Sequence, residues 1–360
     1  MTKQNLPAAL PDMPQGLTAT WLSAVLGQDI QTVTLEQIGE GAGMMSEISR
    51  VHISYADPNH PGPKSIIAKY ASQNPTNREV AMSFNLYERE TRYFAELDEQ
   101  TSAMSPATLL VQIEGDRFVI LMDDLHDYHV GDQRVGATLA QTELAIDELA
   151  KLHGAFWQQV DHLDWIPGIA DSYHADNMRN FSDAGWEQMI SVFGEFIPPD
   201  IAQMKQMYMQ ALPALQAAMH TPPITLIHGD FRMENLLYGT QDDHTPIVII
   251  DWQGPLLGWG MVDVCLLLGQ STQTSVRRQH ERELLQRYHQ GLANLDVAYP
   301  GDMWQDYRMA HLYNWVYVAV VCGALDTSNA RAFAWMTQMV NRQVAATKDL
   351  DLLELLNVYS

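Results

Sequence analysis

The segment His228-Gly-Asp-Phe-Arg-Met-Glu-Asn235 carries the most specific pattern in this chain of 360 residues. An apolar run at 224–227 precedes it, and a second apolar run ends at Asp251, sixteen residues after Asn235. Two such runs predict two short strands that present polar groups at their carboxyl ends. We therefore expect Asp230, Asn235 and Asp251 to lie together at the end of a small ribbon.

These three side chains have the chemistry that phosphoryl transfer requires. One carboxylate positions a hydroxyl and accepts its proton, while an amide and a second carboxylate hold Mg²⁺ beside the nucleotide phosphates. An Asp followed five positions later by an Asn has the spacing of a kinase catalytic loop. The spacing alone carries little weight. Together with the preceding His228-Gly229 and the later Ile249-Ile250-Asp251-Trp252, it predicts phosphotransfer.

Composition indicates a globular protein that repels polyanions. Apolar residues make up 46% of the chain and charged residues 18%, which is typical of a folded protein long enough for two lobes. The chain has 21 Lys and Arg against 44 Asp and Glu, a formal net charge of −23. A charge of this sign disfavours nucleic acid and anionic membranes as partners.

The location follows from what the sequence lacks and from its two cysteines. No apolar segment follows Lys3 as in a signal peptide, and the apolar run at 315–325 is too short to span a membrane. Cys265 and Cys322 lie in apolar, helix-like contexts and are expected to be buried thiols. We predict a cytoplasmic protein. The sequence does not indicate its oligomeric state.

The first third of the chain has the pattern of a small antiparallel lobe. β-branched or alternating runs predict strands, and a 3.6-residue apolar period over 77–97 predicts one helix. Gly115-Asp116 predicts a hairpin turn. The expected strands cover 33–38, 48–55, 65–70, 107–114 and 118–122.

The remainder is predicted to be mainly helical, so the fold class is α+β with a bilobal, protein-kinase-like architecture. We assign 1–30 to an N-terminal arm, 31–122 to an N-lobe, 123–127 to a hinge and 128–360 to a C-lobe. Thr138 is expected to cap the first helix of the C-lobe. Further helices are expected at 183–196, 199–219, 259–269, 275–294, 302–322 and 327–346, with Tyr173, Pro198-Pro199 and Pro222-Pro223 in connections.

The catalytic motifs and their flanks resemble the aminoglycoside phosphotransferase and choline kinase superfamily. His228-Gly-Asp-x-x-x-x-Asn235 and Ile249-Ile-Asp-Trp252 carry that resemblance. The flanking sequences are most similar to the ecdysteroid-kinase-like branch, and they are Met122-Asp-Asp-Leu125, Gly131-Asp-Gln133, Leu152-His-Gly-Ala-Phe-Trp157 and Asp251-Trp-Gln-Gly254. The resemblance spans roughly residues 35–320.

The resemblance implies specific roles. Asp230 matches the catalytic Asp, and Asn235 and Asp251 match the Mg²⁺ ligands. Lys69 fits the lysine that holds the α- and β-phosphates of ATP. Its helical partner matches Glu90 best, although Glu88 also remains an alternative. Asp263 matches an Asp that supports the catalytic loop from below.

Three further groups are assigned more loosely. Arg232, two residues after Asp230, is positioned to stabilise the transferring phosphoryl group or to be a solvated arginine. Gly41 and Gly43 belong to a glycine cluster that suits a phosphate-covering loop or a plain flexible turn. Backbone groups near Met122 and Asp123 are expected to bind the adenine.

The expected acceptor is a small molecule bearing a hydroxyl group. Only seven residues separate Asp251 from the helix expected near Trp259, which leaves no room for a segment that docks a peptide. C-lobe aromatic residues supply either an acceptor pocket or ordinary core. An antibiotic phosphotransferase is the first alternative, and a non-catalytic nucleotide-binding pseudokinase is an alternative of another class.

Overall fold

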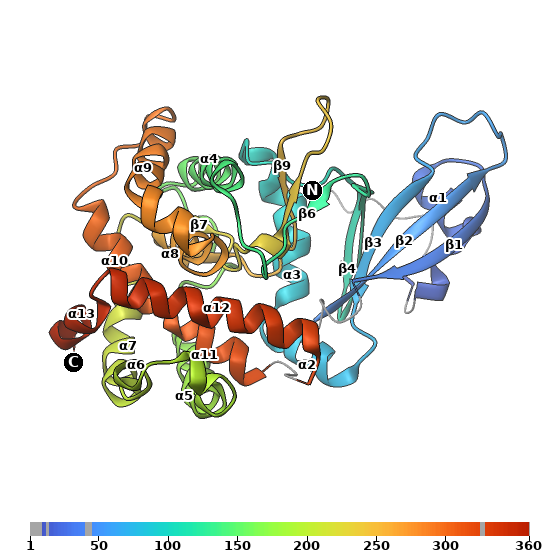
Figure 1. The fold of residues 1–360 in the computed structure, drawn as a ribbon. Coiled ribbons are helices and arrows are strands. Elements are labelled where there is room, and N and C mark those ends of the chain that lie inside the picture. The colour runs from blue at the N-terminus through green and yellow to red at the C-terminus, as the bar shows by residue number, and fades with distance from the viewer. Residues whose placement is uncertain (1–8, 12–13, 40–44, 325–327, 360) are drawn as a thin grey trace. The chain divides into compact units, whose positions relative to one another are not determined.

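The computed structural model describes residues 9–11, 14–39, 45–324 and 328–359. The chain forms two compact units. Unit 1 consists of Met1–Gln100, Ser105–Asp127 and Asp251–Gly254, and unit 2 consists of Thr101–Met104, Tyr128–Ile250 and Pro255–Ser360. Unit 1 contains a five-stranded antiparallel sheet and unit 2 is mainly helical, which confirms the predicted α+β class (Figure 1).

The sheet of unit 1 contains every strand predicted there, with slightly different ends. Its order is β1-β2-β3-β5-β4, and each neighbouring pair is antiparallel. The hairpin turns at Gly115, whose φ of 63° suits glycine, so that Glu114 pairs with Arg117. The strands are β1 (Ile30–Ile38), β2 (Ser46–Tyr55), β3 (Ser65–Ala71), β4 (Thr108–Glu114) and β5 (Arg117–Asp123).

The described residues before the sheet contribute to its core, whereas the sequence assigned 1–30 to a separate N-terminal arm. Helix α1 (Ala19–Leu26) begins at Thr18, whose side chain accepts a hydrogen bond from the Trp21 N–H, and it follows the short 3₁₀ helix η1 (Pro14–Gly16). Trp21 and Leu22 are buried against one face of the sheet. The sheet residues in this core are Ile30, Val51, Ile53, Ile66, Ala68, Tyr70, Val119 and Leu121.

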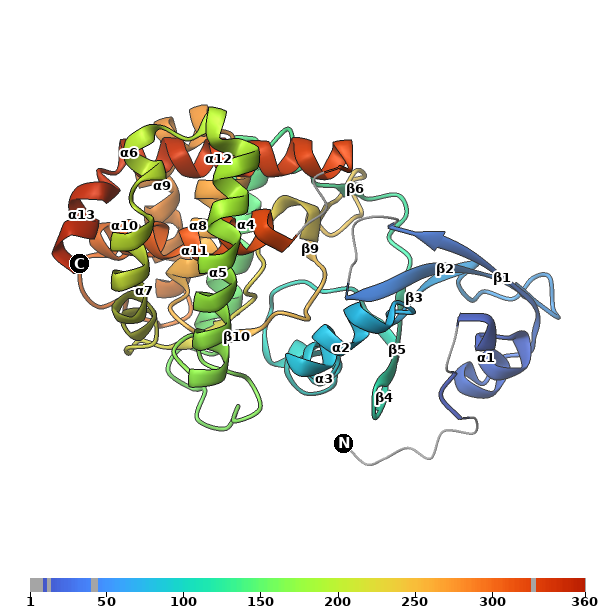
Figure 2. The same ribbon diagram turned by 90° about the horizontal axis from the view of Figure 1, so that it is seen from below.

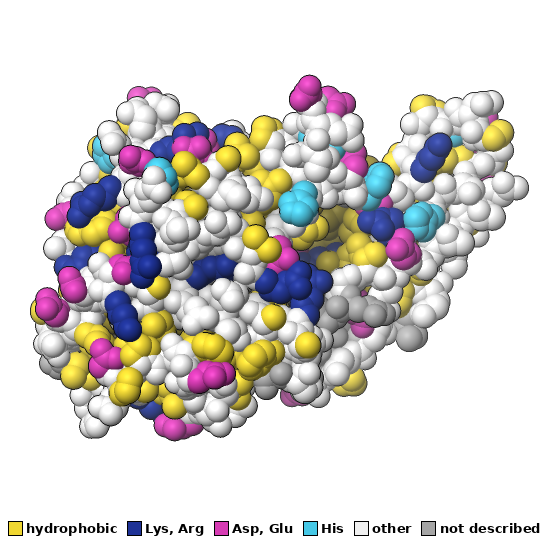
Figure 3. Space-filling view, viewed as in Figure 1, with side chains coloured by type: hydrophobic (Ala, Val, Ile, Leu, Met, Phe, Trp, Pro, Cys, Tyr) yellow, Lys and Arg dark blue, Asp and Glu magenta, His cyan; other side chains and the backbone are white. Residues whose placement is uncertain are grey.

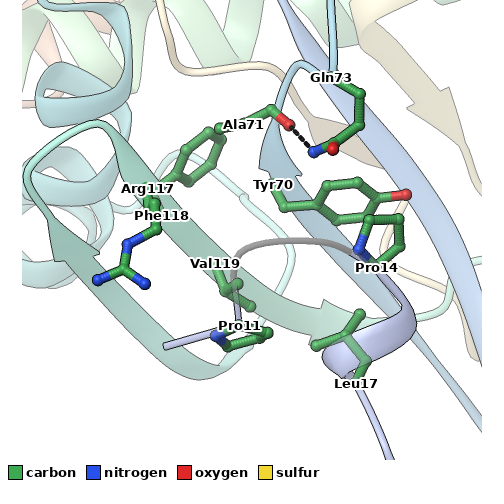
Figure 4. A pocket seen from close by; sticks show the side chains of 9 residues that line it. All are labelled: Pro11, Pro14, Leu17, Tyr70, Ala71, Gln73, Arg117, Phe118 and Val119. Atoms are coloured by element: carbon green, nitrogen blue, oxygen red, sulfur yellow. Dashed lines mark hydrogen bonds between the residues drawn. The ribbon is translucent and has the colours of Figure 1, made fainter. Parts of the chain in front are cut away.

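A small gap remains where the arm meets strands β3 and β5 (Figure 4). Pro11, Pro14 and Leu17 line it on one side, and Tyr70 and Val119 line it on the other. Its volume is about 10 Å³, close to the space that a single water molecule needs. The gap is therefore a packing defect and too small for a ligand.

The single helix expected at 77–97 is broken into shorter pieces. Asn85 has a φ of 54°, in the left-handed region that Asn tolerates better than most residues, and this interrupts the helical hydrogen bonds. The apolar period continues across the break, so periodicity did not reveal it. The pieces are α2 (Pro75–Ser83), α3 (Leu86–Arg92), the π-helical η2 (Tyr93–Leu97) and the 3₁₀ helix η3 (Asp98–Gln100).

Unit 2 consists mainly of helices, several of which differ from the prediction. Thr138 and Gln141 form a capping box at the start of α4 (Leu139–Ala155), as predicted for Thr138. Helix α5 (Ser172–Phe193) begins well before residue 183 and contains Tyr173, so Tyr173 does not mark a connection. The 199–219 and 302–322 helices are each divided, giving α6 (Pro199–Ala202), α7 (Lys205–Met219), α10 (Met303–Tyr313) and α11 (Trp315–Ala324).

The remaining helices of unit 2 include one that was missed. Helices α8 (Met261–Leu266), α9 (Thr274–Ala293) and α12 (Ala330–Asp349) lie near their predicted ranges. Helix α13 (Leu352–Tyr359) was not predicted. The π-helical η6 (Leu267–Ser271) continues α8, and the 3₁₀ helix η4 (Gly194–Phe196) follows α5. Helices α5 and α11 pack closely, because the backbone of Gly185 approaches Ala319 and Gly323 (Figure 2).

Two small sheets in unit 2 position the predicted catalytic segment. Strand β7 (Thr225–Ile227) pairs with β10 (Leu256–Gly258) and leads directly into His228. The second sheet has the order β6-β8-β9, formed by β6 (His129–Val130), β8 (Leu236–Tyr238) and β9 (Ile247–Ile249). Asn235 precedes β8, and Ile250 follows β9. The ribbon expected from the runs at 224–227 and before Asp251 is therefore wrong in its pairing, because β7 pairs with β10 and β9 pairs with β8.

The surface and the cysteines complete the description. On the face of unit 2 seen in Figure 3, basic side chains lie among acidic ones despite the net charge of −23. Cys265 and Cys322 are free, buried thiols, as predicted. No helix within the described ranges is both long and apolar enough to cross a membrane.

Candidate active site

The catalytic segment is held from inside unit 2 by Asp263. This carboxylate lies in the first turn of α8, is fully buried, and accepts backbone N–H bonds from His228 at 2.6 Å and Gly229 at 3.0 Å. Gly229 has a φ of 81°, which glycine adopts without strain. The Asp therefore fixes the sharp turn that carries the chain from β7 to Asp230.

His228 joins the catalytic segment to the end of β9. Its Nδ1 accepts the Asp230 N–H at 3.3 Å, so the ring proton lies on Nε2, which donates to the Ile250 carbonyl oxygen at 3.1 Å. The Ile250 N–H in turn donates to the Asn235 carbonyl oxygen at 2.9 Å. The fully buried imidazole acts as a spacer between the two strand ends.

Asp230 and Asn235 form a matched pair. The Asn235 Nδ2 donates to the Asp230 carbonyl oxygen at 2.9 Å and to its Oδ2 at 3.0 Å. This orients the carboxylate and directs the amide through its nitrogen, which leaves Oδ1 as the atom suited to a hard metal ion. The Asp230 side chain is 47% exposed, so a substrate hydroxyl can reach it.

Arg232 extends along the exposed side of Asp230. Its Nε donates to the Asp230 Oδ2 at 3.1 Å, and its Nη1 lies 3.3 Å from the Glu234 carboxylate. The guanidinium carbon is 5.2 Å from the ring centre of Trp335 on α12, a cation–π distance. Arg331, also on α12, lies 3.5 Å from Glu234. The sequence did not indicate that Trp335, one of the aromatic residues expected in the C-lobe, contacts Arg232, because this contact depends on where α12 packs.

Unit 1 brings together three of the predicted site residues. The Lys69 Nζ, on β3, lies 2.6 Å from the Glu90 carboxylate on α3 and 2.7 Å from the Asp251 Oδ1. Glu88, the alternative partner, lies instead near Arg92 at 3.6 Å. Lys69 and Glu90 are almost completely buried, whereas Asp251 keeps 25% of its side chain exposed. Lys69 is therefore a buried cation flanked by two carboxylates, one of which is partly exposed.

Burial and charge act in opposite directions on this cluster. Burial alone lowers the pKa of Lys69, but the negative charges of Asp251 and Glu90 outweigh it and raise the pKa above its usual value. Burial also raises the pKa of Glu90, and Lys69 opposes that rise. Lys69 thus remains an ammonium at neutral pH.

Asp251 has an unusual backbone conformation. Its φ of 66° lies in the left-handed region, where a non-glycine residue costs of order 1 kcal/mol and where Asp and Asn are the least disfavoured. The next residue, Trp252, is fully buried and stacks on Tyr93 with ring centres 3.7 Å apart. The stacked indole anchors the chain immediately after the strained residue.

Two groups of predicted nucleotide-binding residues remain, those expected to bind the adenine and those of the glycine cluster. Met122 and Asp123 end β5, and the Asp123 N–H donates to the Ala107 carbonyl oxygen at 3.0 Å. An adenine at this position would therefore have to form its hydrogen bonds with another backbone group of the same segment. Gly41 and Gly43 lie outside the described residues.

Asn235 and Asp251 carry hard oxygen atoms, the ligand type that Mg²⁺ prefers. Within the described part of the chain, His, Cys, Asp and Glu side chains form no group of three or more arranged to hold a metal. Mg²⁺ does not require such a group, since it commonly uses one or two protein oxygens together with substrate phosphates and water. Asn235 in unit 2 and Asp251 in unit 1 each supply one suitable oxygen.

Comparison with known proteins places the molecule first in a class and then in a family. The two units and their motifs define the protein-kinase-like fold of the aminoglycoside phosphotransferase and choline kinase superfamily. The chain belongs to the ecdysteroid kinase-like family, to which residues 40–297 match. No curated protein matches the sequence significantly.

Solved structures share this fold at low sequence identity. A protein from Ralstonia eutropha JMP134, provisionally named an aminoglycoside phosphotransferase, is 15% identical with a TM-score of 0.54, covering 92% of this chain and 97% of its own. A microcompartment-associated aminopropanol kinase is 15% identical with a TM-score of 0.52, covering 91% and 96%. The GDP complex of wild-type aminoglycoside 2'-phosphotransferase-IIIa is 13% identical with a TM-score of 0.53, covering 89% and 94%.

Proposed function

We propose that this protein is an ATP- and Mg²⁺-dependent phosphotransferase that moves the γ-phosphate to a hydroxyl group of a small molecule. The observation that carries the proposal is the Asp230–Asn235 pair, in which the amide nitrogen orients a half-exposed carboxylate. Family membership supports a kinase-like phosphotransferase. The buried thiols and the acidic charge fit the cytoplasmic location predicted from the sequence.

In this proposal each residue has one task. Asp230 positions the acceptor hydroxyl and accepts its proton as the oxygen attacks the γ-phosphorus. Lys69, aligned by Glu90, transfers its hydrogen bond from Asp251 to the α- and β-phosphates. Asn235 and Asp251 would hold Mg²⁺, whose positive charge would offset that of the phosphate oxygens.

Arg232 is proposed to stabilise the transferring phosphoryl group. Its guanidinium is held between Asp230 and Glu234 over the face of Trp335, so its orientation is restricted. A fixed cation near the developing charge lowers the transition-state energy because little reorganisation is needed. Gly41, Gly43 and the backbone near Met122 and Asp123 keep their predicted roles in holding the phosphates and the base.

Two alternatives remain open to experiment. An antibiotic phosphotransferase is favoured by the aminoglycoside phosphotransferases among the structures that share the fold. A pseudokinase that binds nucleotide without catalysis is opposed by the simultaneous presence of Lys69, Asp230, Asn235 and Asp251. Degenerate kinases commonly lack at least one of these groups.

The decisive experiment measures slow hydrolysis of ATP without an acceptor, together with thermal stabilisation by ATP and Mg²⁺. We expect the wild type to hydrolyse ATP only when Mg²⁺ is present and to be stabilised by the complex. Asp251→Ala should abolish the hydrolysis, since it removes a metal ligand. Asp243→Ala, on an exposed loop of unit 2, serves as the control and should behave like the wild type. Absence of both responses in the wild type would refute the enzymatic proposal.

A second measurement identifies the acceptor class. Release of ADP or GDP is followed while alcohols, amino alcohols, sterols and aminoglycosides are supplied in turn with ATP or GTP. Stimulation by aminoglycosides alone would establish the antibiotic alternative. Stimulation by another alcohol would identify the acceptor class directly.

A further inference from the structure

A buried glutamine, Gln133, lies directly behind the catalytic turn η5 (Met233–Asn235). It is 1% exposed and belongs to the segment after β6. This segment runs close against the turn, because the Gly131 N–H donates to the Leu236 carbonyl oxygen at 2.9 Å. A Cβ on Gly131 would overlap the carbonyl oxygen of Met233. None of the tasks proposed for the site residues involves Gln133.

The side-chain amide of Gln133 bridges the catalytic turn and the π-helical η6. Its Oε1 accepts the Met233 N–H at 3.2 Å and the Ser271 hydroxyl at 3.0 Å. Its Nε2 donates to the Gln270 carbonyl oxygen at 2.8 Å. One amide thus satisfies two donors and one acceptor, all of them buried. An amide supplies both functions, whereas a carboxylate only accepts and an ammonium only donates.

Arg342 of α12 holds the same segment in place from the other side. Its Nη1 donates to the carbonyl oxygens of Gln133 at 2.6 Å and Gln270 at 3.1 Å. Arg342 is 5% exposed, and burial lowers its pKa to about 10. Burying a guanidinium costs free energy, and its hydrogen bonds to the two carbonyl oxygens offset part of that cost. These bonds hold the segment that carries Gln133 in a fixed position.

The Met233 N–H connects Gln133 to Asn235, the proposed metal ligand. Met233 begins the three-residue turn that ends in Asn235, and the Asn235 N–H closes it by donating to the Arg232 carbonyl oxygen at 2.9 Å. A shift of Met233 therefore rotates the Asn235 amide, whose nitrogen orients Asp230. Both proposed functions of Asn235 depend on this turn.

We propose that Gln133 is a positioning residue that fixes the Met233–Asn235 turn and thereby presents the Asn235 amide for Mg²⁺. The inference rests on the proposed function, because it concerns how this chain orients a ligand for the metal–nucleotide complex. Groups that orient metal ligands through hydrogen bonds commonly change metal affinity or activity by about 10- to 100-fold when removed. Gln133 acts one residue further away, through the backbone of the turn.

The test replaces the amide with an apolar side chain of similar length. In Gln133→Met, we expect the Mg²⁺ concentration for half-maximal thermal stabilisation by ATP to rise about 10-fold, because the Asn235 amide is no longer held. Raising Mg²⁺ should restore part of the slow ATP hydrolysis. Stabilisation by ATP without Mg²⁺ should match the wild type, since Lys69 is unaffected.

The matched control is Gln216→Met. Gln216 is also a 1% exposed glutamine of unit 2, with bonds to Arg179 at 2.6 Å and the Ala175 carbonyl oxygen at 3.1 Å, both remote from η5 in the sequence. Its loss should lower the melting temperature without changing the Mg²⁺ requirement. Ser271→Ala keeps the bond to Met233 and is expected to raise the Mg²⁺ requirement by less than three-fold, which gives a milder variant if Gln133→Met does not fold.

The outcomes separate this inference from the proposed function. If the wild type responds to Mg²⁺ and ATP, and Gln133→Met and Gln216→Met show the same Mg²⁺ dependence as the wild type, Gln133 is merely structural. If Gln133→Met does not fold, Ser271→Ala decides: a Mg²⁺ requirement raised by up to three-fold supports the inference, and an unchanged requirement overturns it. A wild type that ignores Mg²⁺ and ATP refutes the proposed function and this inference together.

Discussion

The proposed nucleotide-binding residues of unit 1 and the proposed catalytic Asp230 of unit 2 differ sharply in burial. In unit 1, Lys69 and Glu90 keep only 5% and 1% of their side chains exposed, and their charges are paired at hydrogen-bond distance. In unit 2, Asp230 keeps 47% of its side chain exposed. Its partners, Arg232 and Asn235, leave it open on one side. One group is built into the core, while the other is presented to solvent.

The difference shows how each group is tied to the fold. A buried charge needs its partner, and removing that partner costs stability. An exposed carboxylate does not need one to the same degree, so it is available for a substrate. Changes in unit 1 should therefore affect both folding and nucleotide binding, whereas changes at Asp230 should affect turnover alone.

The largest effect is expected at Asp230. Asp230→Ala removes the proposed base and should lower turnover by ~10²–10⁴, the usual contribution of general-base catalysis. Thermal stabilisation by ATP and Mg²⁺ should persist, because Lys69 and Asp251 are intact. The measurement is ADP release beside the nucleotide-induced shift in melting temperature. Unchanged turnover would remove Asp230 from the mechanism.

The next effect concerns Lys69. Lys69→Met leaves the Glu90 and Asp251 carboxylates without their shared cation and should cost about 3–5 kcal/mol in the free energy of unfolding. Lys205→Met breaks a more exposed contact with Glu187 and should cost about 0–1 kcal/mol. Urea titrations of both variants test the contrast. Equal losses would mean that burial does not distinguish the two pairs.

The effect of burial on stability can be tested more directly at a buried group that has no partner of opposite charge. His311 is fully buried, and among the described residues neither of its ring nitrogens has a hydrogen-bond partner. Burial lowers its pKa well below the usual value, and the positive charge of Arg277 adds to this. The unfolded chain binds a proton at this site more readily than the folded protein does. The stability that depends on a neutral His311 is therefore fully present above pH ~6.5, and it declines as pH falls below that value.

His311→Leu should remove this dependence. Between pH 7 and pH 5, the wild type should lose more stability than the variant, by at most about 2 kcal/mol, because only 1.5 pH units at about 1.4 kcal/mol each lie below the unfolded pKa of ~6.5. Urea titrations at several pH values measure the difference. Replacing the exposed His162 by Leu is the control and should leave the pH dependence unchanged. Parallel curves for the wild type and His311→Leu would contradict the assignment.

Features confined to short segments were accessible from the sequence. The strands beside His228 and Asp251 follow from two apolar runs and the polar residues after them, and the Thr138 cap follows from local chemistry. The pairing of Lys69 with Glu90 instead of Glu88 came from the resemblance to a family, since both glutamates lie on the same short helix.

The break at Asn85 was not accessible, because one residue adopts a left-handed conformation there and an apolar period does not record backbone conformation.

Features that depend on distant contacts were not accessible either. Gln133 has partners about 100 and 137 positions away, at Met233 and Gln270. Trp335 contacts Arg232 only because α12 packs beside the catalytic turn. A polar or aromatic residue in such a position has no local pattern that distinguishes it from ordinary core.

The ion pair between Lys69 and Asp251 has a consequence for the order in which ligands bind. A divalent ion that approaches alone must compete with an ammonium already 2.7 Å from the carboxylate, and hydrated Mg²⁺ gives up its water reluctantly. A nucleotide that arrives with its metal brings phosphates to receive Lys69, so the carboxylate is released when the metal needs it. If the protein has the proposed function, unit 1 would discriminate between free Mg²⁺ and the metal–nucleotide complex, and kinetics should show the two entering as one species.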